Sequence, residues 1–185
     1  YTLSSSSAAS DVYKRQLQHL TAWLDEQLAN LFRTEGWGPL PHGSLTAASS
    51  DASFRRYFRW QAEGRSFIVM DAPPPQENCR PFVAIARLLG SAGVNVPVIH
   101  AEDLERGFLL LSDLGHQTYL DVIDAGNADA LFHDAIDALL AFQRLPMDAP
   151  LPSYDVALLR REVELFPEWY VGRELGKTFD ERQAA

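Results

Sequence analysis

Apolar positions divide the chain into a helical start, a strand-rich middle and a helical end. Leucines recur at three- and four-residue steps in "LQHLTAWLDEQLANLF", residues 17–32, which predicts an amphipathic helix. In residues 44–71, β-branched and aromatic residues flank Gly64 at hairpin spacing, and a polar loop precedes them. This middle section predicts three antiparallel strands.

A proline-rich segment ends these strands, and a second helix and two further strands follow. Pro81 suits the first turn of the helix, and Gly93 is placed to end it. Its predicted core-facing residues are Phe82, Ile85, Ala86 and Leu89. Residues 94–103 and 107–115 are short apolar runs on either side of a charged turn, which predicts an antiparallel pair that completes the sheet.

The pattern after Gly115 is helical in period over residues 118–123, 128–145 and 153–166, with no further strand. The whole order predicts an α+β fold, in which an antiparallel sheet with a leading helix occupies residues 17–114 and helices occupy residues 115–185. The serine-rich opening lacks the apolar centre of a secretory signal. We therefore expect residues 1–16 to be a disordered tail or a sequence artefact outside the fold.

Composition and charge narrow the classes of partner. The 185 residues are 46% hydrophobic, as expected of a folded chain, but the net charge of −9 repels nucleic acid and anionic membranes. Any affinity for phosphate must therefore be local. Cys79 is the single cysteine, which excludes an internal disulfide and fits a reducing cytoplasm. No apolar run approaches the roughly 18 residues of a membrane span.

The stretch "SSDASFRRYFRW", residues 49–60, is the first candidate for chemistry. In a strand, alternation places Phe58 and Trp60 on one face and Arg55, Tyr57 and Arg59 on the other. The small residues before the strand would let backbone amides approach a phosphate, with guanidinium groups nearby. The alternative is a polar hairpin with solvated arginines. An RNA-binding sheet is disfavoured by the acidic charge and the missing RNP-type glycines.

The order of the predicted elements is that of the small lobe of a kinase. The motifs "SDASFRRYFR", "SFIVMDAPP", "GVNVPVIHAED", "GFLLLSDLG" and "LFPEWYVGR" resemble the aminoglycoside phosphotransferase family, over residues 17–176. The resemblance implies a protein-kinase-like fold whose second, helical lobe begins at residue 115. It also implies a cytoplasmic kinase that uses ATP and Mg²⁺.

Within this family the likeness points to enzymes that phosphorylate the anomeric hydroxyl of N-acetylmuramate or N-acetylglucosamine in cell-wall recycling. Two alternatives remain open. One is another small-molecule hydroxyl kinase, acting on an aminoglycoside, choline or homoserine. The other is a nucleotide-binding or protein-interaction module that performs no catalysis.

The resemblance also implies where ATP would bind. The residues expected to cover the phosphates are Ser50, Asp51, Ala52, Ser53, Phe54 and Arg55, and those expected to form the hinge beside adenine are Leu111, Ser112 and Leu114. Kinases hold the phosphates with a lysine on the third strand, paired with a glutamate on the next helix. Here Met70 or Asp71 occupies the lysine position, and no acid lies on the helix side facing the core. We expect Arg55, Arg56 or Arg59 to supply the missing charge.

Two motifs resemble catalytic signatures without their context. Asp113 in "SDLG" is like a magnesium-binding motif, but it directly follows an apolar strand, at the hinge position. His133 and Asp134 are like a catalytic loop, but Leu139 stands where an asparagine is required. We expect these two side chains to lie on a helix surface, and we assign the scattered histidines no chemistry.

Residues near the end of the chain are candidates for contact with a sugar. Pro167 interrupts a helical pattern, and the resulting bend would present Glu168, Trp169 and Tyr170. Aromatic rings stack on sugar faces and a carboxylate accepts hydroxyl hydrogen bonds, although the same aromatics could instead pack an interface between lobes.

The family's catalytic aspartate, together with its asparagine and aspartate ligands for magnesium, is expected beyond Ala185. We therefore expect the chain to be an amino-terminal fragment that is inactive by itself. Exposed apolar surface is expected around Leu159, Val163 and Phe166.

Overall fold

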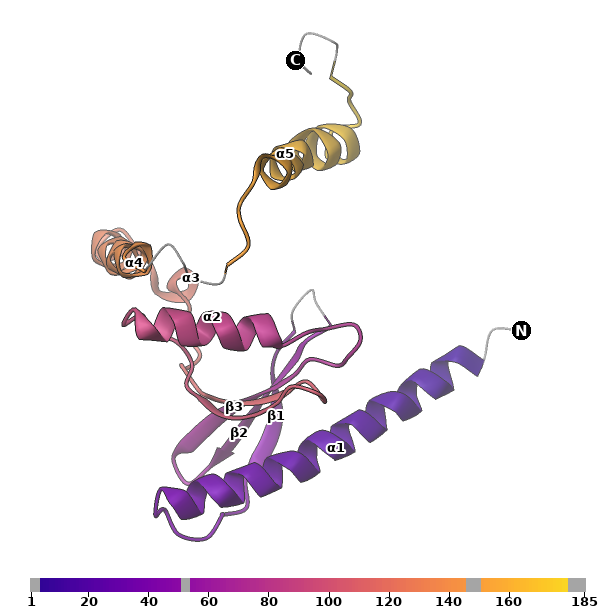
Figure 1. Ribbon diagram of the computed structural model, residues 1–185, viewed down its shortest axis with the longest axis vertical. Coiled ribbons are helices and arrows are strands. Elements are labelled where there is room, and N and C mark those ends of the chain that lie inside the picture. Colours follow the sequence, from indigo (N-terminus) through magenta and orange to yellow (C-terminus); the bar gives the residue numbers. More distant parts are fainter. Residues whose placement is uncertain (1–3, 51–53, 146–150, 180–185) are drawn as a thin grey trace. The chain divides into compact units, whose positions relative to one another are not determined.

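The computed structural model describes residues 4–50, 54–145 and 151–179, which belong to two units, residues 1–145 and 146–185 (Figure 1). The first unit contains α1 (Ser4–Thr34), β1 (Ser44–Ser50), β2 (Arg56–Ala62), β3 (Arg65–Asp71), α2 (Arg80–Ser91), β4 (Ile99–Asp103), β5 (Phe108–Ser112), α3 (Tyr119–Val122) and α4 (Ala128–Gln143). The second contains α5 (Val156–Leu165) and the π-helix η1 (Phe166–Glu174).

The five strands form one antiparallel sheet in the order β1-β2-β3-β5-β4. Between β2 and β3, Glu63 and Gly64 have φ values of 48° and 77°, as in the tight turns that suit the twist of a hairpin. The predicted strands, the hairpin and the helices after the sheet are all present. The α+β class, with an antiparallel sheet followed by helices, is confirmed.

Helices cover both faces of the sheet, α1 on one face and α2 on the other (Figure 1). The α1 core contains Leu20, Trp23, Leu24, Leu28, Phe32, Trp60, Phe67, Val69, Phe108 and Leu110. The α2 core contains Met70, Ala72, Cys79, Val83, Leu109 and Leu111. Because β5 is buried on both faces, four successive apolar residues suit it better than an alternating pattern. Each large side chain buried this way stabilises the fold by about 1.5–3 kcal/mol.

Two expectations about the helices are wrong in part. Residues 4–16 were expected to lie outside the fold, but they are helical, because no glycine or proline interrupts α1 before its end. Residues 1–3 lie outside the described residues. On α2, Val83 is buried whereas Ile85 is 42% exposed, so the helix presents a slightly different side to the sheet than its spacing predicted.

A buried ion pair joins the start of β2 to the end of β3 on the face covered by α1. Asp71 is fully buried and directly opposite Arg56 in the strand register. Its carboxylate accepts hydrogen bonds from the Arg56 guanidinium and, at 3.0 Å, from Gln16 Nε2 of α1. Arg56 lies two residues before Phe58, and Asp71 two residues after Val69, so each shares a strand face with a residue of the α1 side. Arg56 therefore faces α1 rather than α2. The pair therefore ties α1 to the sheet.

The second unit changes helix type at Pro167, as expected of a residue without an N–H group. The sequence predicted a bend, but the chain instead continues from α5 into the π-helix η1. The expected exposed apolar surface is confirmed, since Leu159, Val163 and Phe166 are each 47–72% exposed. In the part of the chain that the structure describes, no helix has both the length and the apolarity to cross a membrane.

We expect Asp71→Ala to lower the free energy of unfolding by about 3 kcal/mol, because it leaves the Arg56 cation without its buried carboxylate. Urea denaturation followed by tryptophan fluorescence measures this, since Trp23 and Trp60 lie in the α1 core. Glu105→Ala is the matched control: Glu105 is 87% exposed in its pair with Arg80, and its loss should change stability by no more than about 0.5 kcal/mol. Equal effects of the two substitutions would contradict the structural role of Asp71.

Candidate functional site

A cavity of about 390 Å³ opens where β5 passes into the linker segment, residues 113–116. Its lining residues are Ala48, Tyr57, Arg59, Ile68, Phe82, Pro97, Leu111, Ser112, Asp113, Leu114, Gly115 and His116. They come from β1, β2, β3, α2, the approach to β4, and β5 with its linker. The volume lies within the range of about 300–1,000 Å³ that is typical of small-molecule sites. Apolar walls with a polar rim suit a flat, partly polar ligand.

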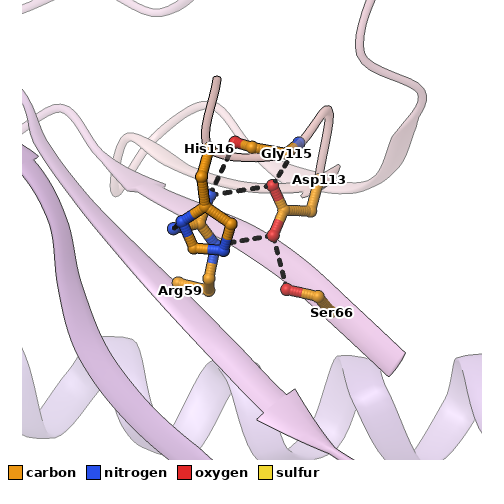
Figure 2. Close-up of polar contacts among 5 residues, drawn as sticks. All are labelled: Arg59, Ser66, Asp113, Gly115 and His116. Atoms are coloured by element: carbon orange, nitrogen blue, oxygen red, sulfur yellow. Dashed lines mark hydrogen bonds and ion pairs between the residues drawn. The ribbon is translucent and has the colours of Figure 1, made fainter. Parts of the chain in front are cut away.

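Arg59 of β2 fixes the linker segment beside this cavity (Figure 2). Its Nε donates to Asp113 Oδ2 at 2.6 Å and its Nη2 to Asp113 Oδ1 at 3.0 Å. Nη2 also donates to the Gly115 carbonyl, and Nη1 lies 2.9 Å from His116 Nδ1. The Asp113 carboxylate accepts two further hydrogen bonds, from Ser66 Oγ and the Gly115 N–H. We call this set of contacts the linker clamp.

The linker clamp is an ion pair shielded from water. The side chains of Arg59 and Asp113 are only 11% and 7% exposed. The hydrogen bond from Arg59 and the further bonds from Ser66 and Gly115 outweigh burial and hold the pKa of Asp113 well below its usual range. The same hydrogen bond raises the pKa of the Arg59 guanidinium. Both groups therefore stay charged at neutral pH, and the linker is fixed to the sheet. With its oxygens occupied by these donors, Asp113 fits the hinge interpretation better than a metal role.

Phe54 and Arg55, just before β2, are held by Glu77 from the segment before α2. The Phe54 N–H donates to Glu77 Oε1 at 3.1 Å, and Arg55 Nε donates to Oε2 at 3.0 Å. The Phe54 ring is 67% exposed. Asp51, Ala52 and Ser53 lie outside the described residues, and Ser50 is the last residue of β1.

The structure brings together some of the predicted site residues and separates others. Leu111, Ser112, Leu114 and Arg59 line the cavity. Arg55 interacts electrostatically with Tyr57, which also lines it. Arg56 lies on the opposite face of the sheet, paired with Asp71. The predicted division of β2 into a face with Phe58 and Trp60 and a face with Tyr57 and Arg59 is confirmed, although the strand begins at Arg56 rather than Phe54.

Sequence reasoning missed several residues at the cavity, namely Ala48, Tyr57, Ile68, Phe82, Pro97 and His116. The alternation that singled out Arg59 also places Tyr57 on the same face, and the register places Ile68 beside Arg59. These two could have been found by following that face across the hairpin. Glu77 carried a weaker signal, as the one acid in "APPPQENCRP".

In the second unit, the three sugar-contact candidates lie on η1. Trp169 and Tyr170 are about half exposed. The Arg173 guanidinium lies 3.8 Å from the centroid of the Trp169 ring and 3.4 Å from Glu168, while Tyr170 stacks on Phe166. Arg173 therefore holds Glu168 and Trp169 together, in an arrangement that suits either a polar ligand or an aromatic packing surface.

The motif at residues 133–134 is surface, as predicted. His133 and Asp134 are exposed on α4, and the His133 ring contacts the Asp129 carbonyl of the preceding turn. Across the described ranges, 4–50, 54–145 and 151–179, no three His, Cys, Asp or Glu side chains form a group that could hold a metal ion.

Comparison with known proteins matches the chain to a family and to closely similar relatives. The model of the phosphotransferase enzyme family matches residues 44–185. A Pseudomonas putida protein named N-acetylmuramate/N-acetylglucosamine kinase is 78% identical over 170 residues, which are 92% of this chain and 50% of that protein. Proteins of the same name from Pseudomonas aeruginosa and Neisseria meningitidis are 63% and 40% identical, over 87% and 75% of this chain and 48% and 43% of their own. The chain spans about half the length of the curated relatives it matches.

We expect Asp113→Asn to destabilise the protein at neutral pH and to matter progressively less in acid. The folded-state pKa of Asp113 lies below its ordinary value of 3.8, so its stabilisation is complete above about pH 4. That stabilisation is lost as the pH falls from about 4 toward the folded-state pKa. The difference between the urea midpoints of the two proteins should therefore be constant from pH 7 to about pH 4 and narrow between pH 4 and pH 2.5.

The matched control for this experiment is Asp134→Asn, which removes an exposed carboxylate of α4. It should leave the urea midpoint nearly unchanged at every pH. A difference between wild type and Asp113→Asn that stays constant from pH 7 to pH 2.5 would show that the carboxylate charge is not what holds the linker.

Proposed function

Because the chain belongs to the phosphotransferase enzyme family, we propose that the cavity beside the linker segment holds the adenine ring of ATP. The cavity supports this through its shape and chemistry. Tyr57, Ile68 and Leu111 provide apolar surface against which a flat base can lie, and Ser112, Asp113 and Leu114 form part of the wall. The single observation that carries the proposal is the linker clamp, which keeps this wall in one conformation.

The triphosphate would extend from the cavity toward Ser50–Arg55, the residues expected to cover it, of which 51–53 lie outside the described residues. Small residues allow backbone amides to approach phosphate oxygens. In kinases Mg²⁺ neutralises the charge that develops on the phosphates. The described residues do not supply a magnesium site, and we assign none of them to the metal.

We propose that the whole protein transfers the γ-phosphate of ATP to the anomeric hydroxyl of N-acetylmuramate or N-acetylglucosamine, in cytoplasmic cell-wall recycling. The names of the relatives support the sugar class. This chain would contribute the nucleotide site, which positions the γ-phosphate for in-line attack. Glu168, Trp169 and Tyr170 would contact the sugar, with Arg173 orienting Glu168 and Trp169.

The proposal is tested with the chain completed by the remaining half of the Pseudomonas putida relative. We expect this protein to phosphorylate N-acetylmuramate and N-acetylglucosamine with ATP, measured by a coupled assay of ADP release, and to leave kanamycin, choline and homoserine unchanged. Preference for one of those three acceptors would replace the sugar assignment with another hydroxyl kinase. Nucleotide binding without any phosphorylation would favour a non-catalytic module.

In the same completed protein, we expect Trp169→Ala to raise the KM for N-acetylmuramate about five- to tenfold, because a stacking surface for the sugar ring is lost. The KM for ATP should stay within about twofold of the wild-type value. Tyr154→Ala is the matched control, since Tyr154 is a similarly exposed aromatic residue of the second unit. Equal increases in both Michaelis constants for Trp169→Ala would indicate a packing role instead.

A further inference from the structure

The sheet face that carries the cavity lacks the ion pair with which kinases usually hold nucleotide phosphates. That pair is a lysine of the third strand and a glutamate of the following helix. Here the β3 residues that face α2 are Ile68 and Met70, and Met70 is fully buried in the α2 core. The sequence of α2, "RPFVAIARLLGS", contains no acid. Asp71 is buried on the other face with Arg56.

A different arginine–glutamate pair connects the same two regions of the fold. Arg55 immediately precedes β2, and Glu77 lies three residues before α2 begins. The Glu77 carboxylate accepts from Arg55 Nε and from the Phe54 N–H, and the Glu77 N–H donates to the Pro73 carbonyl at 3.1 Å. The side chains of Arg55 and Glu77 are 29% and 13% exposed. The pair is therefore anchored at its acidic end and reaches solvent at its basic end.

The Arg55–Glu77 pair lies on the cavity side of the sheet. Arg55 lies two residues before Tyr57 on the same side of the strand and interacts with it electrostatically, and Tyr57 lines the cavity and packs against the α2 core. Arg55 is also close enough to Cys79, a member of the α2 core, to act on it electrostatically. These interactions place Arg55 beside the residues that line the cavity.

The other two arginines of this region bind other parts of the fold. All three guanidinium nitrogens of Arg59 contact the linker segment, at Asp113, Gly115 and His116. Arg56 faces α1. Of the arginines at β2, Arg55 is therefore the one whose position suits contact with a ligand that extends out of the cavity.

We propose that Arg55 binds the phosphate oxygens of the nucleotide and that Glu77 orients it, so that this pair replaces the lysine–glutamate pair of other kinases. The inference rests on the proposed nucleotide site. A guanidinium can bridge two phosphate oxygens with parallel hydrogen bonds, and a carboxylate that holds its Nε fixes the plane of the fork. Glu77 acts as a positioning residue, because it contacts Arg55 rather than the nucleotide.

The experiment measures the affinity of this chain for ATP and for adenosine by isothermal titration calorimetry. Arg55→Ala should lower the affinity for ATP on the order of tenfold to hundredfold, as expected for a lost charge-assisted hydrogen bond. Its affinity for adenosine should stay within about twofold of the wild-type value. Arg55→Lys should recover part of the ATP affinity, because it keeps the charge without the fork. Arg87→Ala is the matched control, since it removes an arginine from an exposed pair with Glu102 and should alter neither affinity.

The role of Glu77 is tested with Glu77→Gln, whose amide oxygen still accepts from the Phe54 N–H. In the Glu77→Gln variant, the ratio of the affinity for ATP to the affinity for adenosine should fall about three- to tenfold. The double variant Glu77→Gln/Arg55→Ala should have the same ratio as Arg55→Ala alone. A purely structural Glu77 would lower the melting temperature and leave this ratio unchanged.

Two outcomes separate the inference from the proposed function. If the wild-type chain binds ATP and adenosine, and Arg55→Ala and Arg55→Lys both keep the wild-type ratio, the assignment of Arg55 is overturned while the adenine site stands. If the wild-type chain binds neither compound, the proposed nucleotide site is overturned and the assignment of Arg55 falls with it.

Discussion

Burial of the sheet on both faces is the constraint from which the arrangement of charges follows. With α1 on one side and α2 on the other, a charged side chain on a strand must find a partner of opposite sign or extend past the end of the strand. Three arginines at β2 meet this constraint, each with its own carboxylate. Arg55 pairs with Glu77, Arg56 with Asp71 and Arg59 with Asp113.

The three pairs connect β2 to three different parts of the first unit. The Arg56 pair joins it to β3 and, through Gln16, to α1. The Arg59 pair joins it to the linker after β5, and the Arg55 pair joins its start to the segment before α2. Residues that are close together in the sequence thus have separate roles, one in the core, one at the wall of the cavity and one beside it.

Local patterns predicted the elements of this fold well, because each depends on neighbouring residues. Gly64 marked the hairpin, the apolar run Phe108–Leu111 marked a strand buried on both faces, and the family motifs pointed to the cavity beside Leu111–Leu114. Such patterns did not predict which residues form the ion pairs. Their partners lie 15 to 54 positions apart, so the choice between Arg55, Arg56 and Arg59 required the register of the strands.

Boundaries were the other weakness of the sequence patterns. The start of α1 was predicted too late because serine-rich sequence is typical of tails, yet nothing in residues 4–16 breaks a helix. At Pro167 the lost N–H could be foreseen, but the sequence does not say whether a helix bends or widens to accommodate it. Both outcomes depend on the competition between neighbouring backbone conformations of similar energy.

The linker clamp has a consequence for where the chain can swivel. Enzymes that close over a ligand do so by rotation at a few hinge residues, which are often loop or element-terminal positions. Here Asp113, Gly115 and His116 are all bonded to Arg59, so rotation at those residues would break several contacts at once. The wall of the cavity is thus held to the sheet by contacts that do not involve the helices beyond it.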